Sequence, residues 1–366
     1  MEQLKAFLKR KNIVISAKRY GIDALGAMAQ GLFCSLLIGT IINTLGEQLG
    51  VPFLVDVGSY ASAMSGAAMA VAIGYALQAP PLVLFSLVTV GYAANALGST
   101  SLIPDQAGAG GPLAVLFIAV IAAEFGKAVS KETKIDILVT PLVTILVGVG
   151  LSAWWAPAIG TAATAVGNII MWATDLQPFL MGIVVSVVIG VALTLPISSA
   201  AICAAFGLTG LAGGAAVAGC CANMVGFAVL SFRENRWGGL VSQGLGTSML
   251  QMPNIVRNPR IWLPAILTSA ITGPLATCVF HLEMNGPPVS SGMGTCGLVG
   301  QIGVWTGWLA PSERAIANGA VAITPGVMDW AGLILISFVL PAILCWAFGL
   351  FFRRIGWIKA GDLTLE

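Results

Sequence analysis

The chain has 366 residues, of which 57% are hydrophobic and only 9% are charged, and its net charge is +2. An average soluble domain carries roughly 25% charged residues. The composition therefore excludes an ordinary soluble protein and indicates a polytopic membrane protein. The nearly balanced charge gives no sign of nucleic-acid binding, and the lipid bilayer is the expected surrounding.

The first 19 residues form a basic segment. It holds six of the seventeen Lys and Arg residues, namely Lys5, Lys9, Arg10, Lys11, Lys18 and Arg19. The positive-inside rule therefore predicts a cytoplasmic N-terminus. Arg353 and Arg354 follow the last apolar run, so the tail at 353–366 is expected on the same side, and the number of spans should be even.

Long apolar runs follow the basic segment. They lie at 24–42, 61–79, 81–98, 112–123, 137–153, 178–195, 261–280 and 331–352. Several approach the ~20 residues that a helix needs to cross the hydrocarbon. We expect an all-α polytopic membrane protein with about eight to ten transmembrane helices once the glycine-rich stretches are counted.

The runs differ along the chain, and this predicts two parts. Residues 20–177 are expected to form a scaffold of regular spans, ending in an interfacial segment at 154–177 that is rich in tryptophan. Residues 178–352 carry nearly all the glycine-rich breaks and are expected to bind the substrate. In the first part, Glu124 and Lys127 have the spacing of an intrahelical ion pair.

Two glycine-rich blocks are nearly alike. Gln243–Leu250 and Ser291–Leu298 share the pattern G-x-G-T-x-x-L, repeated 48 residues apart. Irregular backbone at membrane depth is tolerated only where it is buried in protein or lines a wet cavity. A pair of such elements is a pointer to a transport site. The pattern predicts two glycine-rich re-entrant hairpins.

Uncharged polar residues gather around these blocks. The candidate substrate-binding residues are Asn223, Gln243, Gly246, Thr247, Ser248, Gln251, Asn254, Ser291, Gly294, Thr295 and Gln301. Amides and hydroxyls both donate and accept hydrogen bonds, so this set suits a small hydroxyl-rich solute such as a sugar. The alternative is that they cap broken helices and satisfy freed backbone groups.

The only histidine, His281, stands two residues before Glu283 and just before the second block. These two residues are the candidate catalytic pair, because they could share or relay a proton near neutral pH. The alternative is a histidine at the membrane boundary without such a role. The seven cysteines show no metal-ligand spacing, and neither a metal site nor a cofactor is expected.

Four stretches resemble a known family. They are Leu195–Ala201, Gly219–Ala228, Gln243–Asn254 and Gly292–Gln301, and they look like component IIC, the membrane subunit (EIIC) of the bacterial phosphotransferase system, in the branch that includes the PfoR-like proteins. The resemblance runs from Tyr20 to about Trp330. It implies a homodimeric sugar permease of the bacterial inner membrane, with a scaffold at the dimer contact and a mobile substrate-binding part.

In sugar permeases of this family, a histidine and a glutamate near the hairpins bind the sugar and assist phosphoryl transfer from component IIB. His281 and Glu283 adjoin the second block without standing in the family's motif. The chain is therefore at most the membrane subunit of a sugar phosphotransferase, with the donor on another protein. An ion- or proton-coupled transporter on the same fold, and a membrane solute sensor, are the alternatives.

Overall fold

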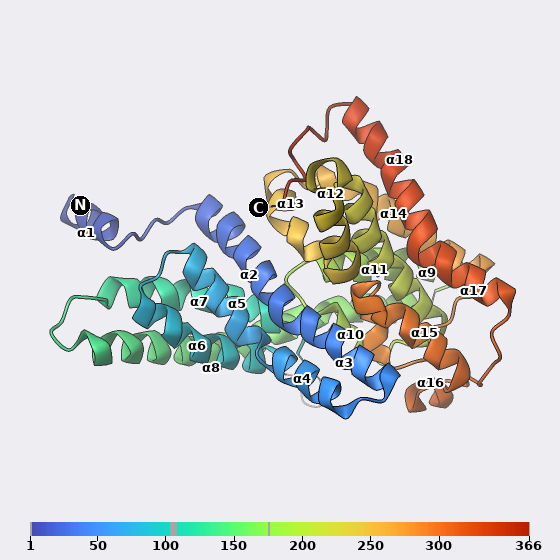
Figure 1. The fold of residues 1–366 in the computed structure, drawn as a ribbon, viewed down its shortest axis with the longest axis horizontal. Coiled ribbons are helices and arrows are strands. Elements are labelled where there is room, and N and C mark those ends of the chain that lie inside the picture. The colour runs from blue at the N-terminus through green and yellow to red at the C-terminus, as the bar shows by residue number, and fades with distance from the viewer. Residues whose placement is uncertain (1, 103–107, 175, 366) are drawn as a thin grey trace. The chain divides into compact units, whose positions relative to one another are not determined.

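The computed structural model describes residues 2–102, 108–174 and 176–365, and nearly all of its regular structure is helical (Figure 1). In this part of the chain no strand occurs beyond an isolated bridge between Gly210 and Met284. Seven of the described helices are long and apolar enough to cross a membrane. Two further helices, Pro52–Ala63 and Ser65–Ala76, are bent by 47° at the break between them and would form an eighth span if they cross together. The helix Pro178–Thr194 is also apolar but shorter. The expected all-α polytopic membrane fold is confirmed.

The chain divides into two compact units, Met1–Ala163 and Thr164–Glu366. The helices that begin in the first unit are α1 (Glu2–Arg10), α2 (Ala24–Leu32), α3 (Ile38–Leu49), α4 (Pro52–Ala63), α5 (Ser65–Ala76), α6 (Pro81–Gly98), α7 (Gly111–Val129) and α8 (Asp136–Thr174). Single π-helical turns at Arg19–Asp23 and Phe33–Leu37 join α2 to its neighbours. Helices α4 and α5 form the bent pair.

Small residues hold the helices of the first unit together. A Cβ atom on Gly91 of α6 would lie 2.2 Å from the backbone oxygen of Gly66 on α5. The two backbones therefore touch directly, which is the usual way for membrane helices to associate in lipid. Met69, Ile73 and Leu87, on the same two helices, are fully buried.

The ion pair predicted in α7 is present. Lys127 Nζ lies 2.8 Å from Glu124 Oε2, and the lysine side chain is buried. Lys127 Nζ also donates to the backbone oxygens of Asn12 and Leu77, at 2.7 and 3.1 Å. A buried ammonium group is costly unless it is paired, so these partners explain how the lysine is accommodated.

Helix α8 covers most of the segment that was expected to be interfacial. It continues without a break from Asp136 to Thr174. Pro141 and Pro157 both lie inside it. The tryptophans at 154 and 155 are exposed residues of this helix, and the interfacial position of the segment stays a prediction.

The second unit contains α9 (Pro178–Thr194), α10 (Ser199–Ala205), α11 (Gly210–Leu230), α12 (Phe232–Val241), α13 (Met252–Arg257), α14 (Leu263–Pro274), α15 (Val299–Leu309), α16 (Glu313–Ala317), α17 (Val327–Ile334) and α18 (Leu340–Arg354). Single turns of other helix types fill the breaks. Those with π geometry are η3 (Ser242–Gly246), η6 (Leu275–Val279) and η9 (Leu335–Val339). Those with 3₁₀ geometry are η4 (Ser248–Gln251), η5 (Pro259–Trp262), η7 (Pro288–Gly292) and η8 (Cys296–Leu298).

Helix α11 is the central element of this unit and packs against α9, α14 and α18. Its glycines and alanines permit this packing, because a Cβ atom on Gly219 would lie 1.8 Å from the backbone oxygen of Ser186 on α9. The stretch before α11 is broken, with α10 ending at Ala205 and Gly207 in a left-handed conformation at φ +61°.

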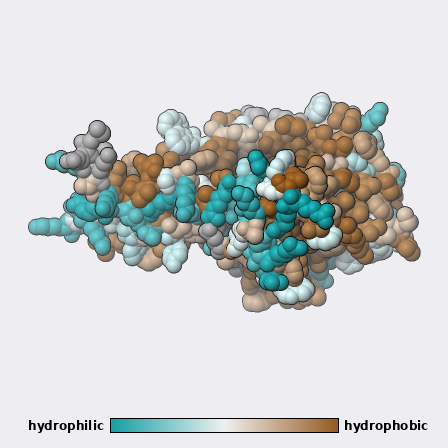
Figure 2. All heavy atoms as spheres, turned by 90° about the horizontal axis from the view of Figure 1, so that it is seen from above, coloured by the Kyte–Doolittle hydropathy of each residue, from teal (hydrophilic) through white to brown (hydrophobic). Residues whose placement is uncertain are grey.

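Large apolar side chains also cover the surface. Along α8, Ile137, Leu138, Leu142 and Leu146 are each more than half exposed. Figure 2 shows broad hydrophobic areas on the face drawn there, beside hydrophilic ones. Exposed aliphatic rows of this extent on helices of membrane length suit contact with lipid chains rather than with water.

Candidate functional site

Asn223 is the centre of the candidate site. It lies on α11, and its side chain is fully buried. Its Nδ2 donates to the Gly219 backbone oxygen at 3.1 Å and to Ser269 Oγ at 3.2 Å. Its Oδ1 accepts from the indole Nε1 of Trp262 at 3.0 Å. One amide thus connects α11 with α14 and η5.

The first glycine block reaches this amide through α9. Ser248 Oγ in η4 lies 2.8 Å from Thr194 Oγ1, at the end of α9, and both side chains are buried. Thr194 Oγ1 also lies 3.3 Å from Asn223 Oδ1. We call the five residues Thr194, Asn223, Ser248, Trp262 and Ser269 the neutral cluster, because none of them carries a charge.

The first block interrupts the helical structure with an irregular turn. Helix α12 and η3 lead to Thr247, whose extended backbone (φ −158°) turns the chain into η4 and α13. Thr247 Oγ1 accepts a hydrogen bond from the backbone N–H of Met249 at 3.1 Å, which caps the returning turn. Gly246 is buried just before this reversal. The irregular backbone expected here is present.

The amides of the first block bind one another. Gln251 Nε2 donates to Gln243 Oε1 at 2.9 Å, and Asn254 Nδ2 donates to Gln251 Oε1 at 2.9 Å. Gln243 Nε2 donates to Ser231 Oγ at 2.8 Å. Buried hydrogen bonds therefore join residues before the irregular turn to residues after it.

The chain end also contacts these amides. Gln251 Nε2 donates to the Leu363 backbone oxygen at 3.0 Å, and Asn254 Nδ2 donates to that of Thr364 at 2.9 Å. Leu363 is fully buried. A second polar network, separate from the neutral cluster, thus binds the C-terminal segment. It consists of Gln243, Gln251 and Asn254. No local pattern in the sequence connects residues 110 or more positions apart.

The second block is held from both sides. Ser291 Oγ donates to the Leu208 backbone oxygen at 2.7 Å, and Ser199 Oγ donates to that of Gly292 at 2.7 Å. Gly294 has φ +54°, and a Cβ atom there would lie 2.6 Å from Cys220 Cβ on α11. Only glycine fits this approach without strain.

The two glycine blocks meet. Thr295 Oγ1 in the second block donates a short hydrogen bond to the backbone oxygen of Gly244 in the first. Gln301, by contrast, lies elsewhere on the second block's helix, where its Nε2 donates to Ser337 Oγ at 3.0 Å. Its buried Oε1 has no hydrogen-bond partner among the described residues.

His281 and Glu283 lie at the surface, between η6 and η7. His281 has a left-handed backbone conformation at φ +46°. Glu283 Oε2 accepts a hydrogen bond from Asn285 Nδ2 at 2.8 Å, and in the described part of the chain no hydrogen bond joins it to His281. The catalytic role of this pair stays a prediction.

Sequence reasoning did not anticipate Ser269 and Trp262. Ser269 lies on α14, 46 positions after Asn223 in the chain. Trp262 lies in η5, 39 positions after Asn223. A serine in an apolar helix and a tryptophan near a membrane boundary are common, so neither carries a signal of its own. Only the packing of α14 against α11 brings them to the site.

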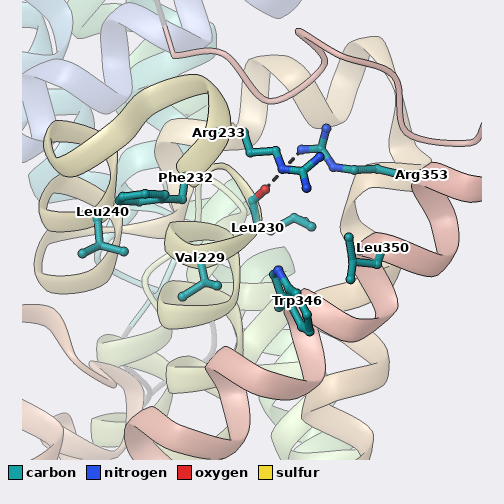
Figure 3. Close-up of a pocket in the computed structure, with 9 residues that line it drawn as sticks. Val229, Leu230, Phe232, Arg233, Leu240, Trp346, Leu350 and Arg353 are labelled. Atoms are coloured by element: carbon teal, nitrogen blue, oxygen red, sulfur yellow. Dashed lines mark hydrogen bonds between the residues drawn. The ribbon is translucent and has the colours of Figure 1, made fainter.

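The second unit also carries a surface pocket, of about 250 Å³, shown in Figure 3. It is lined by residues of α11, α12 and α18, and none of the candidate site residues is among them. The neutral cluster is instead closed, since its members bind one another and are mostly buried.

Comparison with known proteins gives one match. The model of the family described as phosphotransferase system, EIIC, matches residues 22–365. No curated protein and no solved structure matches the chain. The family match covers nearly the entire sequence, including both glycine blocks and the neutral cluster. The chain therefore belongs to the phosphotransferase system EIIC family, the membrane permease components of sugar phosphotransferase systems.

Proposed function

We propose that this EIIC-family chain binds and translocates a small hydroxyl-rich solute, a sugar or a sugar derivative, at the neutral cluster. The observation that carries this proposal is the chemistry of the cluster. Three hydroxyls and an indole N–H gather with the amide of Asn223, and the cluster holds neither a carboxylate nor an ammonium group. Such groups match the alternating donors and acceptors of a sugar and give a charged solute no counter-ion.

Solute entry requires the cluster to open. Each polar atom around Asn223 is satisfied within the protein, so a sugar hydroxyl must replace these partners. The first glycine block supplies Ser248, and the second holds the first through Thr295. We infer that the blocks separate during transport, and that the unit Thr164–Glu366 carries the solute by an elevator-like movement.

Phosphorylation would follow from family membership, with component IIB as the donor. In that step a solute hydroxyl attacks the phosphorus carried by component IIB, the bond to the carrier breaks, and the hydroxyl proton passes to a base. His281 or Glu283 is the proposed base. Both are exposed, and the pair would have to meet the solute after the blocks separate.

The test is uptake into vesicles that contain the purified chain. A panel of labelled sugars, polyols and small acids is offered, and the chemical state of the accumulated solute is determined. A phosphate ester that forms only with added phosphocarrier components would establish group translocation. An unmodified sugar that accumulates with an imposed ion gradient would establish coupled transport instead. Accumulation of acids but not of sugars or polyols would overturn the proposed solute class.

A further inference from the structure

The pocket in Figure 3 has two chemically different sides. Its apolar wall consists of Val229, Leu230, Leu240, Trp346 and Leu350, with Phe232 beside it. Its polar side carries two guanidinium groups, those of Arg233 and Arg353. The pocket is therefore amphipathic, with positive charge at one side and hydrocarbon at the other.

The two arginines differ in their partners. Arg353 forms an ion pair with Glu234 at 2.9 Å and donates to the Leu230 backbone oxygen at 3.2 Å. Arg233 is exposed and makes no hydrogen bond or ion pair with any residue that the structure describes. Glu234 neutralises Arg353, so the charge of Arg233 is the one that stays unbalanced at the pocket.

The pocket lies where two helical stretches of membrane length end, Gly210–Leu230 and Val327–Arg354. Leu230 is the last residue of α11, and Arg353 and Arg354 form the end of α18. Trp346 is 53% exposed, and Trp237 is 70% exposed and follows Arg236, whose left-handed backbone (φ +52°) kinks α12. Exposed tryptophans beside basic residues at the ends of spans are typical of the membrane interface, where lipid headgroups lie.

We propose that the pocket binds an anionic phospholipid. Its phosphate oxygens would accept hydrogen bonds from Arg233 and from the free edge of Arg353, because guanidinium groups match the geometry of a phosphate. The start of an acyl chain would lie against Leu240, Trp346 and Leu350. The apolar wall favours a lipid over a free phosphate ion, since a free ion would leave that wall uncovered.

A lipid in this position would connect α12 to α18. Helix α12 leads directly into η3 and the first glycine block. The bound lipid would therefore restrain the segment that enters the transport site, and it should raise the thermal stability of the whole second unit.

The experiment uses the full chain, purified in a neutral detergent and exposed to equal amounts of phosphatidylglycerol and phosphatidylcholine with the same acyl chains. Retained lipid is counted by native mass spectrometry, and the thermal midpoint is measured with each lipid. We expect about a fivefold preference for phosphatidylglycerol in the wild type, and its loss in Arg233→Gln. Arg354→Gln is the matched control, because Arg354 is adjacent, exposed and outside the pocket.

Three outcomes would overturn the proposal. The first is equal retention of the two lipids by the wild type. The second is an equal loss of preference in Arg233→Gln and Arg354→Gln, which would indicate general surface charge. The third is displacement of the lipid by sn-glycerol 3-phosphate at similar concentration, which would indicate a site for a soluble phosphate.

Discussion

Gln251 donates a hydrogen bond from Nε2 to the backbone oxygen of Leu363, 3.0 Å away and 112 positions later in the chain. The same nitrogen donates to Gln243 Oε1, and Asn254 donates to Gln251 Oε1. A residue that the sequence suggests for solute binding thus joins the first glycine block to the C-terminal segment. This assigns Gln251 a part in stability and leaves Asn223 as the better candidate for the solute.

Gln251→Ala should therefore destabilise the protein. The substitution removes the donor to Gln243 and Leu363 and leaves Asn254 with one partner fewer, all in a buried setting. Leaving buried polar groups unsatisfied costs about 1–3 kcal/mol. The measurement is the thermal midpoint in detergent. Thr364→Ala is the control, because Asn254 bonds to Thr364 only through the backbone oxygen. A Gln251→Ala protein that keeps its thermal midpoint but binds the solute more weakly would assign Gln251 to solute binding instead.

Asn223→Ala should weaken solute binding as well as stability. Its amide bonds to the backbone of Gly219 and to three members of the neutral cluster, and the substitution removes the acceptor of Trp262 and the donor to Ser269. The expected loss of stability is again about 1–3 kcal/mol. The deciding measurement is the KM of uptake for the transported solute, which should rise.

Gln301→Ala is the matched control for Asn223→Ala. Gln301 is also a buried amide of the second unit, but it bonds to Cys221 and Ser337 outside the neutral cluster. The Gln301→Ala substitution should lower the thermal midpoint of the protein with little change in the KM of uptake. If both variants change KM equally, the effect reports general loosening of the unit, and the cluster is not the solute site.

The sequence predicts the helices well. Its apolar runs are long enough to span a bilayer, and a helix satisfies the backbone hydrogen bonds of such a run within the hydrocarbon. It also predicts irregular backbone at the two glycine blocks, because glycine at Gly294 permits both a left-handed φ and a close approach to Cys220. The ion pair of Glu124 and Lys127 follows from helical spacing alone.

Long-range pairing is what the sequence does not reveal. Asn223 and Gln251 look alike as buried amides near glycine blocks, yet one bonds to Ser269 and Trp262 and the other to the C-terminal segment. Their partners are decided by how α14 and the chain end pack, and single-sequence periodicity carries no information on this.

Gly294→Ala should abolish uptake while the protein still inserts into the membrane. An alanine in the left-handed region costs roughly 1–2 kcal/mol, and its Cβ would lie 2.6 Å from Cys220 Cβ, so overpacking adds about 1–3 kcal/mol. Gly238→Ala is the control, because a Cβ atom there meets nothing within 4 Å. Uptake at the wild-type rate in Gly294→Ala would remove the second block from the transport site.

Glu132→Gln should release α1, at the start of the basic segment, from the rest of the first unit. Glu132 pairs with Arg10 at 2.7 Å and with Lys11 at 2.5 Å, and α1 ends at Arg10. The hydrogen bond from Lys11 lowers the pKa of Glu132, with the charge of Arg10 acting in the same direction. A carboxyl whose folded pKa is depressed contributes its stabilisation at neutral pH and loses it as the pH falls through the folded pKa.

The release is measurable as the fluorescence anisotropy of a dye attached at Gln3→Cys, in a background in which the exposed Cys34 and Cys278 are replaced by alanine. At pH 7, Glu132→Gln should lower the anisotropy, because the amide keeps the shape of the side chain and removes its charge. The parent protein should reach the same value only when the pH falls below the usual glutamate pKa of about 4.3. Glu47→Gln is the control, because Glu47 contacts Asn43 and not the basic segment. A parent protein that releases the segment at a pH well above that value would show that another group holds it.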